Sequence, residues 1–233
     1  MRRIVTLVLV AAVLVATAAV ALATQSPKTL SASIVAAARA QRSVHWSSTE
    51  VIGVVALTTG TDATTTGGVQ QVNFHVGTKR AHVRLIVKGG VAYVRGDALG
   101  LQLNLSLTKA QATTYAGRWI SIPRGDKAYA STAAGDTMGS VADELAPHGQ
   151  LSLVSTKLHG VRVIGVRGVA GTGKKKKEEV LVTHAHGKRL PLEEDVVAPG
   201  ENFISHTTFG KWNETVTVTA PASSTPIATV RAS

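Results

Sequence analysis

One stretch of the chain nearly fits a phosphate-binding loop. Gly168 to Lys175 reads GVAGTGKK, close to the pattern GxxxxGK[ST], but Lys175 stands where that pattern needs a hydroxyl to hold Mg²⁺. More lysines and two glutamates follow instead of an apolar helix whose N-terminus could face phosphates. The stretch therefore predicts a hairpin loop. Lys174, Lys175, Lys176 and Lys177 could contact an anionic membrane surface, and the alternative is a solvated loop tip.

A histidine pair is the best candidate for a metal site. His184 and His186 form H-x-H on an expected strand, where both side chains share one face. Such a pair can bind zinc when a third ligand is added, and His206 or Glu179 could supply it. No spacing in the sequence brings these residues together. We therefore expect surface histidines, no metal and no cofactor.

The carboxylates and serines show no catalytic pattern. Glu193, Glu194 and Asp195 are consecutive and predict a solvated run, and Asp143 with Glu144 lies near a helix end. Neither set resembles a paired acid and base. No serine stands in a G-x-S-x-G nucleophile elbow. The sequence thus predicts no catalytic residue and a protein that is not an enzyme.

Composition sets limits on the core and on the partners. The 233 residues contain no cysteine, which excludes disulfides, thiolate metal sites and lipid attached to a cysteine. Hydrophobic residues make up 44% and aromatics only 4%, so the core is built from Val, Leu, Ile and Ala. A net charge of +11 favours anionic partners. The basic residues are scattered without interleaved aromatics, so we expect no nucleic-acid partner, and we expect a monomer.

The first 23 residues read as a targeting segment. Arg2 and Arg3 precede the apolar run Ile4 to Val20, and Ala21-Leu22-Ala23 forms an A-x-A cleavage pattern. Cleavage there predicts an exported protein, in the extracytoplasmic cell envelope or secreted. The alternative is an uncleaved anchor formed by residues 4–23, which are long enough to span a bilayer.

The remainder divides into a helix, a long β region and a tail. Residues 24–42 are expected to be a linker and a helix, Leu30 to Gln41, followed by a β domain over 43–221 and a disordered tail over 222–233. Alternating apolar and polar residues predict an antiparallel meander. Two helices are expected in it, over 108–115 and 131–145, with a loop over Gly60 to Gly68 and a last strand over Thr215 to Thr219.

The segment from Leu99 to Leu107 gives conflicting signals. Every second residue is leucine, and a period of two predicts a strand. Leucine nevertheless favours helices, and the segment has no β-branched residue.

Three runs in the chain resemble a known group of proteins. VAYVRGDALGL, YAGRWISIP and GDKAYAS, together with FGKWNETVTVTAP from Phe209 to Pro221, resemble exported actinobacterial proteins of the LolA-like class, near the LprG and LppX lipoprotein carriers. The resemblance covers about Val44 to Pro221. It implies an α+β fold in which helices pack on the concave face of a curved antiparallel half-barrel sheet. It also implies that Ala98 to about Asn104 is helix or loop. Many relatives carry a lipobox cysteine, which this chain lacks.

The resemblance implies an apolar cavity for acyl chains between sheet and helices. The leading hypothesis is therefore non-catalytic binding or transport of a lipid or lipoglycan in the cell envelope. The alternative is a membrane-anchored structural or signal-receiving ectodomain with a filled core and no ligand. Strand alternation and helix faces select the candidate cavity residues Phe74, Val83, Leu85, Val87, Tyr93, Leu101 and Leu145.

Overall fold

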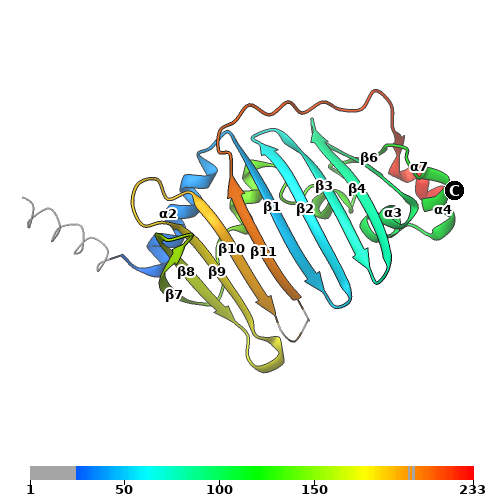
Figure 1. Ribbon diagram of the computed structural model, residues 1–233. Helices are drawn as coiled ribbons and strands as arrows, with labels where there is room; N and C mark the ends of the chain where they lie inside the picture. Colours follow the sequence, from blue (N-terminus) through cyan, green and yellow to red (C-terminus); the bar gives the residue numbers. More distant parts are fainter. Residues whose placement is uncertain (1–24, 199, 201–202) are drawn as a thin grey trace, which may run out of the picture.

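The alternating segments form one open, curved sheet of twelve strands within the described part of the chain (Figure 1). The computed structural model describes residues 25–198, 200 and 203–233. Its strand order is β12-β6-β5-β4-β3-β2-β1-β11-β10-β9-β8-β7. The targeting segment predicted over residues 1–23 lies outside the described residues. Among the described helices none is long and apolar enough to cross a membrane.

Two antiparallel meanders share this sheet. The strands of the first are β1 Ser43–Ile52, β2 Val55–Thr64, β3 Gly67–Val76, β4 Lys79–Lys88, β5 Val91–Gly96 and β6 Ile120–Pro123. Those of the second are β7 Gln150–Leu158, β8 Val161–Ala170, β9 Lys177–His184, β10 Pro191–Ala198 and β11 Phe203–Gly210. Antiparallel pairing of β1 with β11 joins the two meanders. The short strand β12, Thr225–Pro226, adds to β6 in parallel.

Helices cover one face of the sheet, which is the concave face (Figure 1). They are α2 Pro27–Arg39, α3 Ala98–Leu105, α4 Lys109–Tyr115, α5 Tyr129–Thr132, α6 Met138–Glu144 and α7 Ile227–Ala232. The predicted fold class, a curved antiparallel half-barrel with helices on its concave face, is confirmed.

Two apolar clusters fill the space between helices and sheet. One lies beneath α3, α4 and α7 and contains the buried faces of β3 to β6. The other lies beneath α2 and α6, and its residues include Ile34, Met138 and Leu181. The sheet thus has two separate apolar cores on the same face.

Residues Leu99 to Leu107 resolve the conflict in favour of helix. The side chain of Asp97 accepts a hydrogen bond from the Gly100 amide at 2.7 Å and so caps α3. The helix ends at Ser106, which adopts the left-handed conformation with φ 53°. Leu101 and Leu105 lie four residues apart and are both buried in the first cluster. The period of two was therefore misleading, and the helix implied by the resemblance is confirmed.

The loop predicted over Gly60 to Gly68 is wrong. Strand β2 continues to Thr64, and β3 begins at Gly67. Thr61 is buried, and the amide of Gln70 donates a hydrogen bond of 3.0 Å to its hydroxyl from the neighbouring strand. The threonines, which are β-branched, favour the pleated sheet more strongly than the glycines oppose it.

The helix predicted over residues 131–145 is divided into α5 and α6. Gly135 lies between them with φ +72°, a conformation that only glycine adopts without strain. A side chain at this position would also meet the Trp46 ring at 2.8 Å. Close packing of the backbone on Trp46 therefore interrupts the helix.

The disordered tail predicted over 222–233 is also wrong. Residues Thr225–Pro226 form β12, and α7 buries Ile227 and Val230 in the first cluster. Arg231 forms an ion pair of 2.7 Å with Asp126. The strand expected over Thr215 to Thr219 is not formed, and this stretch instead runs across the ends of the strands to β12 (Figure 1). Two apolar residues one helical turn apart thus anchor α7 on the sheet.

We predict that Ile227→Ala destabilises the protein by about 2 to 5 kcal/mol, because it leaves a cavity in a packed core. Thermal or denaturant unfolding measures the change. The control is Thr229→Ala on the exposed side of α7, which should change stability by less than about 0.5 kcal/mol. Equal stability of the two variants would show that α7 does not contribute to the core.

Candidate functional site

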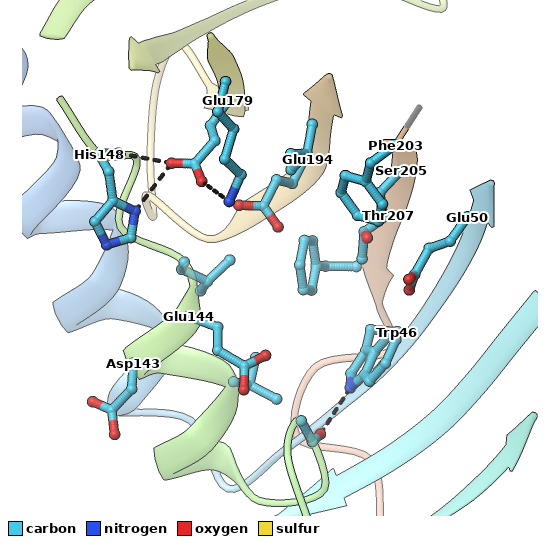
Figure 2. Close-up of a pocket in the computed structure, with 16 residues that line it drawn as sticks. Trp46, Glu50, Asp143, Glu144, His148, Glu179, Glu194, Phe203, Ser205 and Thr207 are labelled. Atoms are coloured by element: carbon cyan, nitrogen blue, oxygen red, sulfur yellow. Dashed lines mark hydrogen bonds and ion pairs between the residues drawn. The ribbon is translucent and has the colours of Figure 1, made fainter. Parts of the chain in front are cut away.

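A groove of about 430 Å³ lies between α6 and the concave face, where β1, β11, β10 and β9 are adjacent (Figure 2). Its volume falls within the range of about 300 to 1,000 Å³ that is usual for ligand pockets. We call it the concave groove. It is lined by Trp46, Glu50, Gly135, Val141, Asp143, Glu144, Leu145, His148, Lys177, Glu179, Glu194, Val196, Phe203, Ser205, Thr207 and Phe209.

Strand register explains why these side chains meet. Trp46 is opposite Phe209, and Glu50 is opposite Ser205, across the β1–β11 pair. On the next strand Glu194 is opposite Thr207. Side chains alternate between faces along a strand, so the groove-lining residues of β1, β11 and β10 share one face of the sheet.

One part of the groove is apolar. Val141 and Leu145 belong to the second apolar cluster, and Trp46 and Phe209 pack against it. The indole N–H of Trp46 donates a hydrogen bond of 3.0 Å to the Gly135 carbonyl, which fixes the orientation of the ring. The aromatic rings therefore form a preformed apolar wall.

The other part of the groove is acidic. Glu179 is only 6% exposed, and Lys177 contacts its carboxylate at 2.6 Å. The backbone N–H of His148 donates a further hydrogen bond of 2.7 Å, and the His148 ring lies 3.1 Å from the same oxygen. Burial alone would raise the pKa of Glu179, but these hydrogen bonds outweigh it and hold the pKa below its ordinary value. Glu179 is thus a buried, ionised and fully engaged carboxylate.

Glu194 has the opposite character. Burial, followed by repulsion from Glu179, raises its pKa to about 7, although Lys177 partly offsets the shift. This carboxyl therefore titrates near neutral pH. A protonated carboxyl can donate a hydrogen bond as well as accept one.

Two more carboxyls near the groove have pKa values above their ordinary ones. Burial raises the pKa of Glu144, and repulsion from Asp143 adds to the shift. Asp136, next to Gly135, is completely buried, and neither of its oxygens has a hydrogen-bond partner among the described residues. Burial and the charge of Glu144 raise the pKa of Asp136 to about 7. This end of the molecule is therefore sensitive to protonation near neutral pH.

A neutral carboxyl beside an ionised one can serve general acid–base catalysis. In this groove, however, Glu179 has its oxygens engaged by Lys177 and His148 and is almost inaccessible. It is therefore held as a fixed charge that raises the pKa of Glu194. Hydrogen bonding and apolar contact are the interactions that the groove offers to a ligand.

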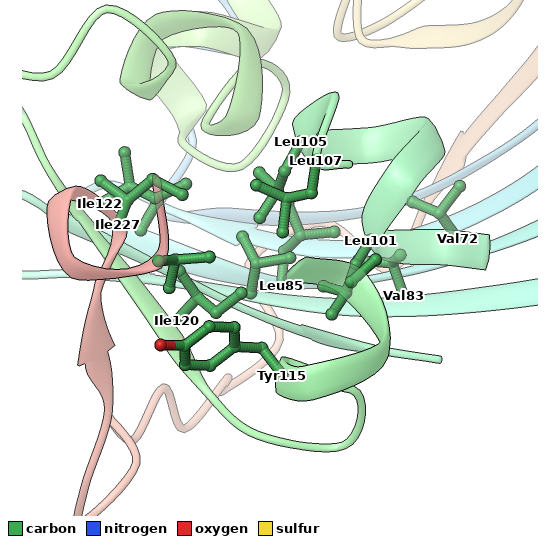
Figure 3. Packing of buried hydrophobic residues seen from close by; sticks show 14 of the residues in the cluster. Val72, Val83, Leu85, Leu101, Leu105, Leu107, Tyr115, Ile120, Ile122 and Ile227 are labelled. Carbon is green, nitrogen blue, oxygen red and sulfur yellow. The ribbon is translucent and has the colours of Figure 1, made fainter. Parts of the chain in front are cut away.

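Five of the seven predicted cavity residues pack together away from this groove. Phe74, Val83, Leu85, Val87 and Leu101 belong to the first apolar cluster, where α3, α4 and α7 cover the sheet (Figure 3). Each is at most 7% exposed, and the cluster also contains Tyr115 and Ile120.

The other two predicted residues have different positions. Leu145 lines the concave groove, at the first turn beyond α6. Tyr93 is opposite Ile86 and Ser121, whereas its neighbour Val94 is opposite Leu85. It lies on the outer face of the sheet, so its assignment to the cavity was wrong by one face.

The predicted histidine and lysine sites also separate. His184 ends β9, His186 follows the buried Ala185, and both are exposed. The described residues contain no group of three potential metal ligands. Lys177 is engaged by Glu179 in the groove, Lys175 and Lys176 lie exposed in the β8–β9 connection, and the side chain of Lys174 lies outside the described part.

The sequence analysis missed the polar half of the groove. Glu194 was assigned to a solvated run, but β10 places it on the concave face, with Glu193 and Asp195 on the other face. A signal was present, because Leu192 to Val196 can be read as a strand with alternating faces. The pairing of β10 with β11 that brings Glu194 to Thr207 had no local signal.

Comparison with known proteins supports the fold. No protein-family model matches the chain, and no curated protein matches it. Among solved structures, LprF from Mycobacterium bovis is similar with a TM-score of 0.51 and 11% identity, over 85% of this chain and 99% of LprF. A DUF1329 family protein from Desulfovibrio piger is 9% identical over 84% of this chain and 96% of its own, but its TM-score of 0.33 is too low to support an argument.

LprF belongs to the LppX- and LprG-like group, whose fold is LolA-like. The structural resemblance predicted from the sequence is therefore confirmed. At 11% identity the similarity concerns the fold alone.

We predict that Asp136→Asn makes stability less dependent on pH. The folded-state pKa of about 7 lies above the ordinary 3.8, so the native state holds a proton that the unfolded state has lost between these values. The stability contributed by that proton is present below about pH 3.8 and is lost as the pH rises through about 7. At about pH 8 the variant should be more stable than the parent by roughly 2 to 4 kcal/mol, and the difference should fall below about 1 kcal/mol near pH 4.

Thermal unfolding at both pH values measures this difference. The contrasting control is Asp126→Asn, because a hydrogen bond from the Ala128 amide and the Arg231 side chain lowers the pKa of Asp126. That substitution should destabilise the protein at both pH values. If Asp136→Asn lost stability with pH as steeply as the parent, Asp136 would not be the group responsible.

Proposed function

We propose that the protein binds a lipid or lipoglycan non-catalytically in the concave groove. The observation that carries the proposal is a single groove with an aromatic and aliphatic wall on one side and polar groups on the other. An amphiphile needs both surfaces. Each methylene group buried against the apolar wall contributes about 0.8 kcal/mol.

The apolar wall can hold an acyl chain. Trp46 and Phe209 are opposite each other across β1 and β11, and Leu145 and Val141 approach from the region of α6. Phe203, also on the concave side of β11, extends the wall toward the other end of that strand.

The polar side favours an uncharged head group. Glu50, Glu144 and Glu194 lie on this side with Ser205 and Thr207. Ionised carboxylates repel an anionic head group, whereas carboxyl and hydroxyl groups hydrogen-bond to glycerol or sugar hydroxyls. The groove therefore suits a hydroxyl-rich lipid better than an anionic one.

The resemblance to the LprG and LppX carriers is consistent with this proposal, but the site differs from the one expected. Five of the seven residues first assigned to the cavity belong to the packed cluster under α3, α4 and α7. The proposed ligand site is instead under α6, and of the seven residues first assigned only Leu145 lines it. An extracytoplasmic location in the cell envelope or outside the cell remains part of the proposal.

A second candidate function is a structural or signal-receiving ectodomain with a filled core. The dense packing of Leu85, Leu101 and Ile120 favours it for one half of the molecule. The concave groove in the other half favours the ligand-binding function. Occupation of that groove distinguishes the two.

We predict that Thr207→Trp weakens binding of 1-monolauroylglycerol by at least about tenfold, because the indole fills the groove between Trp46 and Glu194. Titration followed by native mass spectrometry or calorimetry measures the affinity. Thr49→Trp is the matched control, since Thr49 is exposed on the outer face of the adjacent strand.

The control should bind like the parent. If neither the parent nor the control binds the monoglyceride, the proposed function fails and the filled-core ectodomain remains. If Thr207→Trp binds as well as the control, the ligand lies elsewhere.

A further inference from the structure

One end of the sheet carries a concentration of exposed apolar side chains. Eight large hydrophobic residues are exposed in the described part of the chain, and five of them lie at this end. We call these five the apolar rim: Val51, Ile52, Val54, Val197 and Ile204. Val54, at the turn between β1 and β2, is 84% exposed.

The rim is contiguous. Ile204 on β11 is opposite Val51 on one side and Val197 on the other, so these three side chains are neighbours on the outer face. Ile52 follows on the concave side, and Val54 extends beyond the strand ends. Single exposed hydrophobics are ordinary, whereas contiguous ones mark an interaction surface.

Basic residues flank the rim on both sides. On one side β2 pairs with β3 through Val55 and Val76, and Val76 is opposite Lys79, which is followed by Arg80. On the other side Val197 is opposite Glu178, which places the β8–β9 connection with Lys175 and Lys176 at the same end.

Figure 1 shows the β1–β2, β3–β4 and β8–β9 turns together along the lower edge of the sheet. Glu178 lies 3.8 Å from Lys176 and 2.7 Å from Arg167, so this acid is countered within its own flank. Lys79, Arg80 and Lys175 are exposed. We call Lys79 with Arg80 on one side, and Lys175 with Lys176 on the other, the basic flanks.

We propose that the apolar rim and its basic flanks dock on an anionic lipid bilayer. Apolar side chains enter the interface of a bilayer, and lysine and arginine are attracted to anionic head groups around them. A second copy of this chain fits less well, because a twofold contact through the rim would place one basic flank against another.

The rim adjoins the concave groove. Glu50 and Phe203, which line the groove, are the immediate neighbours of Val51 and Ile204. Docking would therefore bring one end of the groove to the bilayer surface. This consequence alone rests on the proposed function, since docking itself depends only on the rim and its flanks.

The test uses the absence of cysteine from the full chain, which makes a single introduced cysteine the only labelling site. Val54→Cys is labelled with an environment-sensitive fluorophore, and its emission is followed with vesicles of phosphatidylcholine with and without phosphatidylglycerol. Val161→Cys is the matched control, because Val161 is also exposed but lies at the opposite end of β8.

The local readout separates docking of the rim from any binding by residues 1–23. We expect a blue shift at position 54 with the anionic vesicles, a much smaller shift with phosphatidylcholine alone, and none at position 161. In the Val54→Cys background, Lys175→Glu with Lys176→Glu should raise the vesicle concentration for half-maximal shift at least about fivefold. Lys157→Glu with Lys188→Glu, at the opposite end, should leave it unchanged. High salt should weaken the emission shift of the labelled Val54→Cys protein.

An unchanged spectrum at position 54 with anionic vesicles overturns the proposal. A shift that grows with protein concentration without vesicles also overturns it and identifies self-association. The groove variant Thr207→Trp should keep the vesicle response, so failure of docking and failure of ligand binding are distinguishable.

Discussion

The pairing of β1 with β11 is the interaction on which the rest of the structure depends. It joins residues about 160 positions apart in the sequence, from His45 opposite Gly210 to Ile52 opposite Phe203, and so makes one sheet from two meanders. We call this strand pair the seam. A hydrogen bond of 2.9 Å between the hydroxyls of Ser47 and Thr208 crosses it on the outer face. On the concave face the seam brings Trp46 against Phe209, and thus forms one wall of the groove. The apolar rim crosses the same seam at its end. The groove and the proposed docking surface therefore both require this single strand pairing.

The concave face of the sheet has two kinds of interior. Beneath α3, α4 and α7 the concave face is apolar and its side chains interdigitate, as in an ordinary protein core. Across β2, β1, β11 and β10 the same face carries Thr61, Ser48, Thr207 and Glu194, which are partly or fully buried. Polar groups in this position cost free energy unless they are hydrogen-bonded or neutral. Burial accordingly raises the pKa values of Glu194 and Asp136 and so favours their neutral forms.

Much of the fold could be predicted from the sequence, but little of the site. Local patterns predicted the helix near Leu30 to Gln41 and the helix that begins near residue 108, because helix capping is decided by neighbouring residues. The resemblance corrected the reading of Leu99 to Leu107, where alternation alone misled. The burial of α7 and the inward position of Glu194 depend on contacts between distant segments, which strand alternation does not reveal. The error at Tyr93 has the same origin, since a period of two identifies two faces without saying which one is covered.

The central claim is that the concave groove holds a lipid. Native mass spectrometry of the protein purified from its own host, followed by organic extraction, tests it most directly. The account predicts a co-purifying lipid or lipoglycan in near-stoichiometric amount, with an uncharged, hydroxyl-rich head group. A bare mass that stays unchanged after incubation with added lipid would contradict the account and leave a filled-core ectodomain in its place.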